Sequence, residues 1–388
     1  MRNGVAPTLA TLFVASAVWA ASACSSFSAS ETPADVTDGM AEGAATDGPG
    51  GGSDGSVGPG GDASNAATSV YVIGGEIPPP VVDGGITLTN SVVFATQQAD
   101  GTLGSWAETT PVRGYVHGNA AVASSGAIVT LAGEVQGPVG PPSAIDVPSR
   151  AAILGGGQLD GWMDTLALPD RIYFHAAVTV NGRVYVMGGH VPGKDAVSNV
   201  RFAPVAAEGS IGTWVETAAL PGAPRERLAA ATDGVHVFVV GGESAGQCAT
   251  DVLVGTIGST GEIATWASTG RSYVGQSPGV VVFANKLYIL GGFGCAGGSG
   301  GSAAVQIAEI QPEGTLGTFT SGAALPSARS GLGAVVLGQH LYAIGGDDGD
   351  GPVTDVSVAN LDGAGAFDAW HPGPPLPSGR SRFGIAAH

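Results

Sequence analysis

The chain has few basic residues: lysine and arginine together number 14, against 32 aspartate and glutamate residues. The formal net charge at pH 7 is −18. A nucleic-acid groove needs clustered lysine and arginine to neutralise phosphates, so this composition argues against nucleic acid as a partner. Net negative charge instead favours solubility and disfavours adsorption to anionic surfaces.

Helical periodicity and cysteine are also scarce. No long stretch after residue 24 repeats its apolar residues about every 3.6 positions, which predicts little helix. Only three cysteines occur, at Cys24, Cys248 and Cys295. Glycine, by contrast, is abundant, with 66 of 388 residues, many of them in turns between short apolar runs. Many short strands joined by Gly-rich turns are typical of an all-β protein.

Residues 1–23 have the features of a secretory signal peptide. Arg2 supplies a positive charge, an apolar stretch follows, and the small residues Ala21-Ser22-Ala23 precede Cys24. This junction resembles the bacterial lipoprotein box, which implies lipidation of Cys24 and sorting to the outer membrane or the cell surface. The alternative is a secreted or periplasmic protein in which Cys24 is incidental.

Residues 24–68 are expected to form a disordered tether. They are mainly Ser, Ala, Gly, Thr and Asp, with almost no large apolar side chain. Such a composition cannot bury enough surface to offset the entropy lost on ordering. The folded domain is therefore expected over residues 69–388, held off the membrane by a coil of about 35–40 Å root-mean-square length.

Two sequence marks recur six times in residues 69–388. The first is a glycine pair after an apolar run, with Ala132 replacing the first glycine of the second copy. The pairs end at Gly75, Gly133, Gly189, Gly242, Gly292 and Gly346. The second mark is an aromatic residue at Trp106, Trp162, Trp214, Trp266, Phe319 and Trp370. Both return every 50–58 residues, a period that indicates a propeller or a solenoid.

The repeat unit is clearest in residues 329–370. Apolar runs at Leu332–Leu337 and His340–Ile344 are followed by a third run at Val353–Asn360 and a fourth at Ala366–Trp370. Tight glycine turns between such runs predict four short antiparallel strands. The first two runs are apolar throughout, as expected of strands covered on both faces. The recurring aromatic residues are expected to pack between neighbouring units.

This unit resembles the kelch repeat. The shared features are an arginine before the first strand, an aromatic residue three positions before the glycine pair, the pair itself and the later tryptophan. A bacterial variant with a Gly-x-apolar-Gly-x-Trp segment is matched by Gly101–Trp106, Gly209–Trp214 and Gly314–Phe319. The resemblance implies four-stranded blades arranged around a central channel. The second copy departs most from the pattern.

The two ends of the domain complement each other. It begins with Ser69–Gly75, a second strand without a first, and ends with Arg380–His388, a first strand without a second. Pairing them completes one blade and removes the open edge that antiparallel sheets must otherwise protect. The sequence thus predicts an all-β, six-bladed kelch-type β-propeller, its ring closed by pairing of the N- and C-terminal strands.

One arginine precedes the first strand of each repeat. These residues are Arg113, Arg171, Arg225, Arg271, Arg329 and Arg380. Family resemblance places the first strand innermost, so the six would ring one mouth of the channel and could bind a carboxylate or a phosphate. The simpler alternative is that each pairs locally with a carboxylate or a backbone carbonyl at a blade junction.

The sequence offers a possible disulfide and a weak cation site. Cys248 and Cys295 follow their glycine pairs in successive copies, and two remaining cysteines in an exported protein suggest a bond between them. Free or buried thiols are the alternative. Asp347, Asp348 and Asp350 form an oxygen-rich loop that could hold Ca²⁺, but without the EF-hand pattern a solvated turn is the simpler interpretation.

The seven histidines show no metal-ligand spacing. His117 and His175 lie at similar phases of successive copies, which favours packing or hydrogen bonding between blades. We therefore expect no metal ion and no cofactor.

The function that these features favour is non-catalytic binding. No nucleophile motif is present, and we expect a monomeric module for a protein or glycan partner in the envelope or outside the cell. Some kelch-type propellers are enzymes, namely copper radical oxidases and sialic-acid mutarotases. The cysteines here have no copper-ligand context, so the alternative is a mutarotase- or lyase-like enzyme acting on an anionic sugar at the arginine-lined mouth.

Overall fold

In a computed structural model of the protein, the described residues are 69–79, 87–136, 143–273, 275–295, 301–367 and 369–388. The predicted signal peptide, Cys24 and the predicted tether lie outside them. The regular secondary structure of the described part is β-strands and one 3-10 turn, η1, at Gly155–Gly157. It contains no helix long and apolar enough to cross a membrane.

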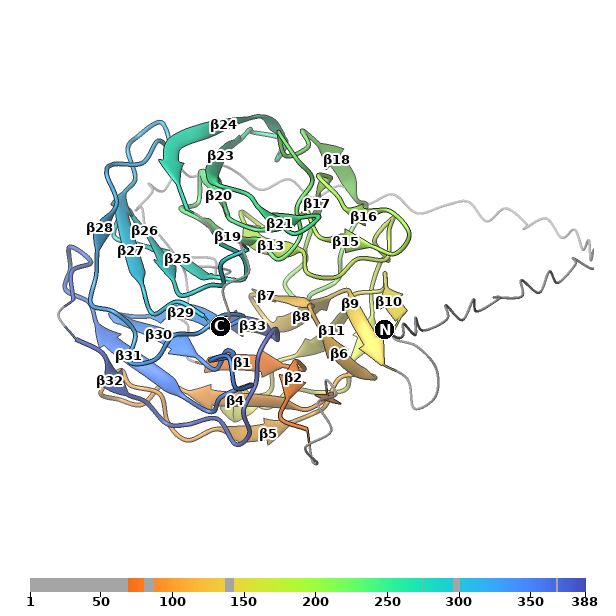
Figure 1. Cartoon of the computed structure of the whole chain (residues 1–388). Coiled ribbons are helices and arrows are strands. Elements are labelled where there is room, and N and C mark those ends of the chain that lie inside the picture. The colour runs from red at the N-terminus through yellow and green to blue at the C-terminus, as the bar shows by residue number, and fades with distance from the viewer. Residues whose placement is uncertain (1–68, 80–86, 137–142, 274, 296–300, 368) are drawn as a thin grey trace, which may run out of the picture. The chain divides into compact units, whose positions relative to one another are not determined.

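Six four-stranded antiparallel sheets form the blades of a propeller (Figure 1). The innermost strands of blades one to six are β33 (Gly384–Ala387), β7 (Ala120–Ser124), β13 (Ala176–Val180), β19 (Ala229–Thr232), β25 (Gly279–Phe283) and β29 (Gly333–Leu337). The second strands are β1 (Ser69–Ile73), β8 (Ala127–Leu131), β14 (Arg183–Met187), β20 (His236–Val240), β26 (Lys286–Leu290) and β30 (His340–Ile344). These second strands are buried on both faces, as their apolar sequences predict.

The third strands are β4 (Val92–Thr96), β11 (Ser149–Ala152), β17 (Val200–Pro204), β23 (Asp251–Ile257), β27 (Val305–Glu309) and β31 (Val356–Asn360). The outer strands are β5 (Ala107–Thr109), β12 (Met163–Asp164), β18 (Val215–Thr217), β24 (Ile263–Ser272), β28 (Thr320–Ser321) and β32 (His371–Pro372). Blade two is complete although its sequence departs most from the repeat. Ala132 adopts φ 46° there, the conformation that the first glycine of the pair takes in the other blades.

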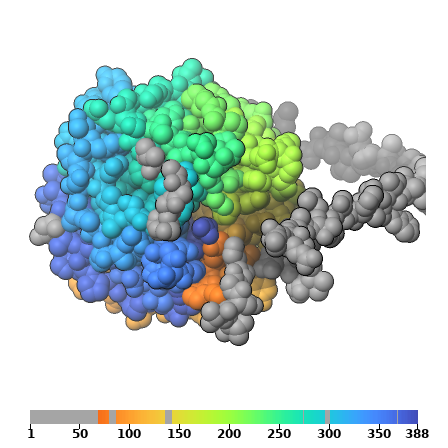
Figure 2. Space-filling view, in the orientation of Figure 1, coloured from red at the N-terminus to blue at the C-terminus, as the bar shows by residue number. Residues whose placement is uncertain are grey.

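The ring closes through the two ends of the domain. β33 pairs with β1 in an antiparallel register that runs from Val70↔Ala387 to Ile73↔Gly384. Each innermost strand contacts the innermost strands of the two neighbouring blades, from β33 through β7, β13, β19, β25 and β29 back to β33. The closure predicted from the sequence is therefore confirmed. In the space-filling view, the blades follow one another around the ring in chain order (Figure 2).

One face of the ring carries short extra strands that follow the glycine pairs (Figure 1). Two-stranded sheets form from β2 (Glu76–Ile77) with β3 (Thr87–Leu88), β15 (His190–Val191) with β16 (Asp195–Ala196), and β21 (Glu243–Ser244) with β22 (Gln247–Cys248). In blade two, β6 (Tyr115–His117), β9 (Gly133–Gln136) and β10 (Ser143–Ile145) form a three-stranded sheet.

The repeated sequence marks hold neighbouring blades together. The second glycine of each pair donates its N–H to a carbonyl just before the next blade's first strand, for example Gly346 to Arg380 at 2.8 Å. A Cβ on Gly345 would lie 2.5 Å from that same carbonyl oxygen, which explains glycine in the pair. The repeat tryptophans also bond across blades, since the Trp106 indole N–H donates to the Pro374 carbonyl at 2.8 Å.

Candidate functional site

The channel mouth on this face is encircled by a closed ring of backbone hydrogen bonds. One residue per blade takes part, just before the innermost strand: Arg382, Gly118, Phe174, Arg227, Ser277 and Gly331. Each N–H donates to the carbonyl of the residue before it in that order, and Arg382 donates to Gly331, at distances of 2.7–2.9 Å. We call these six residues the collar.

The collar has an unusual backbone conformation. All six residues have positive φ values between 51° and 59°, although four of them are not glycine. Such a conformation costs about 1–3 kcal/mol for a non-glycine residue and persists only where surrounding structure enforces it. The closed hydrogen-bonded ring provides that enforcement.

Two cavities of about 120 Å³ each open at the collar. Arg227 and Arg382 line both of them. These two residues come from blades four and one, so they stand on opposite sides of the six-membered ring. A further cavity of about 170 Å³ lies between the innermost strands of all six blades. The mouth is therefore a concave polar site with guanidinium groups on both sides.

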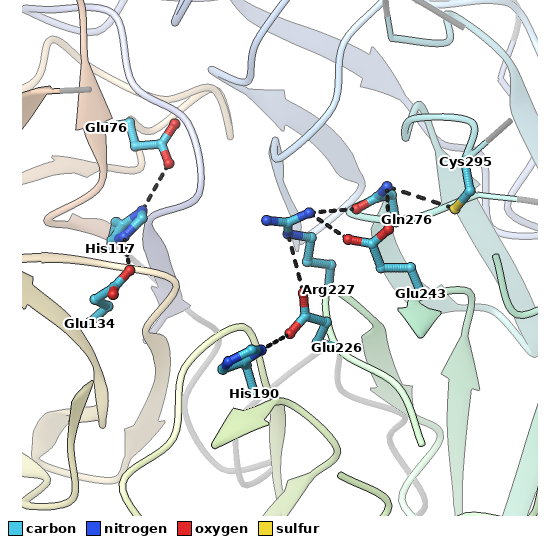
Figure 3. Close-up of polar contacts among 9 residues, drawn as sticks. All are labelled: Glu76, His117, Glu134, His190, Glu226, Arg227, Glu243, Gln276 and Cys295. Carbon is cyan, nitrogen blue, oxygen red and sulfur yellow. Dashed lines mark hydrogen bonds and ion pairs between the residues drawn. The ribbon is translucent and has the colours of Figure 1, made fainter. Parts of the chain in front are cut away.

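Arg382 belongs to a cluster that links blades one and two. Its Nη1 lies 2.6 Å from Glu76 Oε2. The other oxygen of Glu76 lies 2.8 Å from His117 Nδ1, and His117 Nε2 lies 2.8 Å from Glu134 (Figure 3). Both ring nitrogens of His117 are thus occupied by carboxylates of neighbouring blades. This cluster confirms hydrogen bonding between blades for His117.

Arg227 belongs to a second cluster, in blades three to five. Its Nη1 lies 2.5 Å from Glu243 and 3.3 Å from the Gln276 side-chain oxygen (Figure 3). Gln276 in turn donates to the second oxygen of Glu243 at 3.2 Å. Glu226 lies 4.0 Å from Arg227 Nε and 2.5 Å from His190 Nδ1, which leaves His190 Nε2 free of that bond. Acidic and basic groups thus alternate within this cluster.

Aromatic rings complete the mouth between the two clusters. The Arg227 guanidinium stacks over Phe174 at 4.7 Å from the ring centre. Tyr173 lies 4.7 Å from the His190 ring centre. Burial raises the pKa of Tyr173 to about 12, and the Glu134 and Glu226 carboxylates add to the rise. At neutral pH, the Tyr173 hydroxyl is therefore protonated and able to donate a hydrogen bond.

The structure does not gather the six predicted arginines at a mouth, which corrects that expectation. Arg225, Arg329 and Arg380 are buried, with 2%, 0% and 2% of their surface exposed. Arg329 donates to the Gly345 and Asp355 carbonyls and to Ser357, while Arg380 bonds the Ser91 carbonyl and hydroxyl. Arg225 forms a bidentate ion pair with Asp251. Each of these three side chains bonds groups of its own blade.

The remaining three lie away from the cavities at the collar. Arg113 is exposed and pairs with Asp164 at 3.1 Å, and Arg271 donates to the Gly317 carbonyl at 2.6 Å. Arg171 is exposed. None of these three lines a cavity at the collar.

The two other predicted sites lie near the mouth. A disulfide joins Cys248 in blade four to Cys295 in blade five, with Cα atoms 5.3 Å apart. Asp347 and Asp348 accept backbone N–H groups from their own loop at 2.8 and 3.0 Å, the geometry of a self-capped turn. Among the described residues, no group of three or more His, Cys, Asp or Glu side chains could hold a metal ion.

Sequence reasoning missed the two mouth arginines, although a signal was present. Each mouth arginine stands two residues after one of the six repeat arginines: Arg227 follows Arg225, and Arg382 follows Arg380. The other four copies have no second arginine there. A residue that departs from a structural repeat is freer to serve a ligand, so this departure could have located the mouth.

Comparison with known proteins agrees with this architecture. Residues 328–377, which cover blade six, match the Kelch motif family. The chain is a kelch-repeat β-propeller. A solved structure titled "Structure of YjhT" resembles it with a TM-score of 0.60 and 14% identity, over 79% of this chain and 98% of that one. At this identity the likeness concerns the fold alone. No curated protein matches this kelch-repeat chain in sequence.

Proposed function

We propose that this kelch-repeat protein is a glycan-binding module of the cell envelope, tethered through a lipid on Cys24. The observation that carries the proposal is the composition of the mouth. The guanidinium donors Arg227 and Arg382 line cavities of about 120 Å³ together with the amide of Gln276 and the carboxylate of Asp347. Carboxylate acceptors bond both arginines from the side. Sugar hydroxyls both donate and accept hydrogen bonds, so a surface that alternates donors and acceptors suits them.

A protein partner is supported less well by this mouth. Protein interfaces are centred on aromatic and apolar anchors. Six large apolar side chains are strongly exposed among the described residues, and none of them lines a cavity at the collar. Tyr115, Leu154, Met163, Leu166, Val215 and Val235 make up this set.

A second candidate function is an enzyme acting on a sugar, mutarotase- or lyase-like. The observation that favours it is the trio of His190, Glu226 and Tyr173. Glu226 bonds one ring nitrogen of His190, which orients the other, and the Tyr173 ring lies 4.7 Å from the same imidazole, centre to centre. A base and an acid placed together in this way could transfer protons to and from a bound sugar.

Binding to a panel of glycans, measured by calorimetry on the purified chain, tests the proposal. We expect Arg227→Met or Arg382→Met to weaken binding of any recognised glycan about tenfold or more, since each removes hydrogen bonds from a charged donor. Arg113→Met is the matched control, because this exposed arginine lies away from the mouth. Absence of glycan binding, or binding that ignores both mouth arginines, would contradict the proposal.

Two further readouts separate the parts of the proposal. Anomer exchange or product formation, followed by NMR with any sugar that binds, would establish the enzyme in place of the module. Cys24→Ala should move the chain from the membrane fraction to the soluble fraction. A chain that stays soluble with Cys24 intact would remove the lipid anchor from the proposal.

A further inference from the structure

Both mouth arginines already have a carboxylate partner. Arg382 pairs with Glu76 at 2.6 Å, and Arg227 pairs with Glu243 at 2.5 Å. The guanidinium side chains are 30% and 31% exposed, whereas the two carboxylates are 7% and 13% exposed. The carboxylates therefore lie beneath the arginines, which present their remaining N–H groups to the cavities.

The surrounding charges make the mouth negative. Among the described residues, Glu134 and Glu226 in the clusters and Asp347 in the lining add three more carboxylates, and the cavities bring no further arginine or lysine. The two clusters and the cavity lining thus bring together five carboxylates, two guanidinium groups and two histidines, His117 and His190. Even if both histidines carry a proton, the carboxylates outnumber the positive groups. The chain as a whole has a formal net charge of −18, which adds a long-range repulsion of anions.

From this arrangement we infer that the mouth selects uncharged, hydroxyl-bearing sugars over their acidic counterparts, with Glu76 and Glu243 setting that selectivity. The inference rests on the proposed glycan-binding function. A hydroxyl group accepts a hydrogen bond from an arginine and can donate one to a carboxylate. An anionic group can only accept, and beside Glu76 or Glu243 it meets a like charge, which acts against the wrong ligand.

The inference requires that the resident carboxylates stay ionised, and the environment of Glu76 ensures this. Burial alone would raise the pKa of Glu76, but the hydrogen bond from His117 and the charge of Arg382 outweigh it. The pKa of Glu76 therefore lies below its ordinary value. At neutral pH, this carboxylate neutralises Arg382.

Matched sugar pairs that differ by one carboxylate test the selectivity: glucose with glucuronate, and galactose with galacturonate. We expect the natural chain to bind the neutral member of a recognised pair about tenfold more tightly. Glu243→Gln, alone and with Glu76→Gln, should reverse that preference by freeing the arginines. Glu208→Gln is the control, because Glu208 is exposed and lies away from the collar. A natural chain that prefers the acidic sugar would overturn the inference.

A titration with sulfate tests the charge selectivity by itself, because sulfate is an anion without a sugar. Its result therefore distinguishes a failure of this inference from a failure of the glycan proposal. NMR of the Arg227 side-chain N–H during a sulfate titration should show no saturable shift in the natural chain and a saturable one in Glu243→Gln. If no sugar binds but sulfate behaves in this way, the glycan function fails and the charge selectivity stands. If sulfate shifts the signal equally in both chains, Glu243 does not neutralise Arg227 and the selectivity fails.

Discussion

Deleting residues 380–388 is expected to unfold the whole propeller rather than blade one alone. The deletion removes β33, its antiparallel pairing with β1, and the buried side chains of Arg380 and Phe383. Each buried large side chain contributes roughly 1.5–3 kcal/mol, and domains are stable by only about 5–15 kcal/mol. We expect loss of the cooperative thermal transition, measured by circular dichroism.

The control for this deletion is a cut of equal length in the predicted tether, residues 45–53, which should leave the transition unchanged. A milder variant, Ala386→Pro, blocks pairing within β33, because Ala386 lies opposite Tyr71 at a hydrogen-bonded position of the pair and proline cannot donate to a sheet. It should lower the melting temperature while retaining a measurable transition. A normal transition in the deletion variant would show that the ring is not held closed by its ends.

Arg329→Met is expected to destabilise the protein by about 2–4 kcal/mol. The arginine is completely buried and donates to two carbonyls and a hydroxyl of blade six. Its own carbonyl accepts the N–H of Gly292, from blade five, at 2.8 Å. Methionine fills a similar volume but leaves those acceptors without a donor. The midpoint of chemical denaturation measures the loss.

Burial also lowers the pKa of Arg329, while the carboxylates of Asp355 and Asp348 oppose that shift. The buried charge thus carries a desolvation cost, which is why the expected net loss is smaller than the sum of the broken hydrogen bonds.

Arg113→Met is the matched comparison for Arg329→Met, because Arg113 holds the same place in its repeat. Its side chain is 65% exposed and its ion pair with Asp164 is exposed as well. Exposed pairs of this kind contribute little, so we expect a change within about 0.5 kcal/mol. Equal losses in the two variants would mean that burial does not distinguish these arginines.

The fold could be predicted from the sequence because six copies of one unit establish its pattern even where a single copy departs from it. Ala132 breaks the glycine pair of copy two, yet blade two forms, since Ala132 accepts the positive φ that the position demands. The ends Ser69–Gly75 and Arg380–His388 each lack one strand, and only their pairing makes both complete. The period of the repeat and the complementary ends of the domain are therefore enough to predict the architecture, without any knowledge of side-chain contacts.

The site could not be predicted in the same way, because residues only two positions apart in the sequence differ in whether their side chains are buried. Arg380 is buried and tied to blade one, whereas Arg382, two residues on, faces the mouth. What separates them is the positive φ of Arg382, which redirects the chain at the collar. Sequence shows two arginines, but only the backbone conformation tells which one meets solvent. The simpler alternative, local pairing with a carboxylate or a backbone carbonyl, describes Arg225, Arg329 and Arg380.

The collar has a consequence for how this propeller could change its ligand. Its six peptide groups point head to tail around a circle, so their dipoles cancel, and every N–H is already bonded. Unlike the N-terminus of a helix, where free N–H groups attract anions whatever the side chains are, this backbone attracts no charge of either sign. Recognition is left to side chains on a neutral frame, and exchanging them can alter the ligand while the ring stays intact.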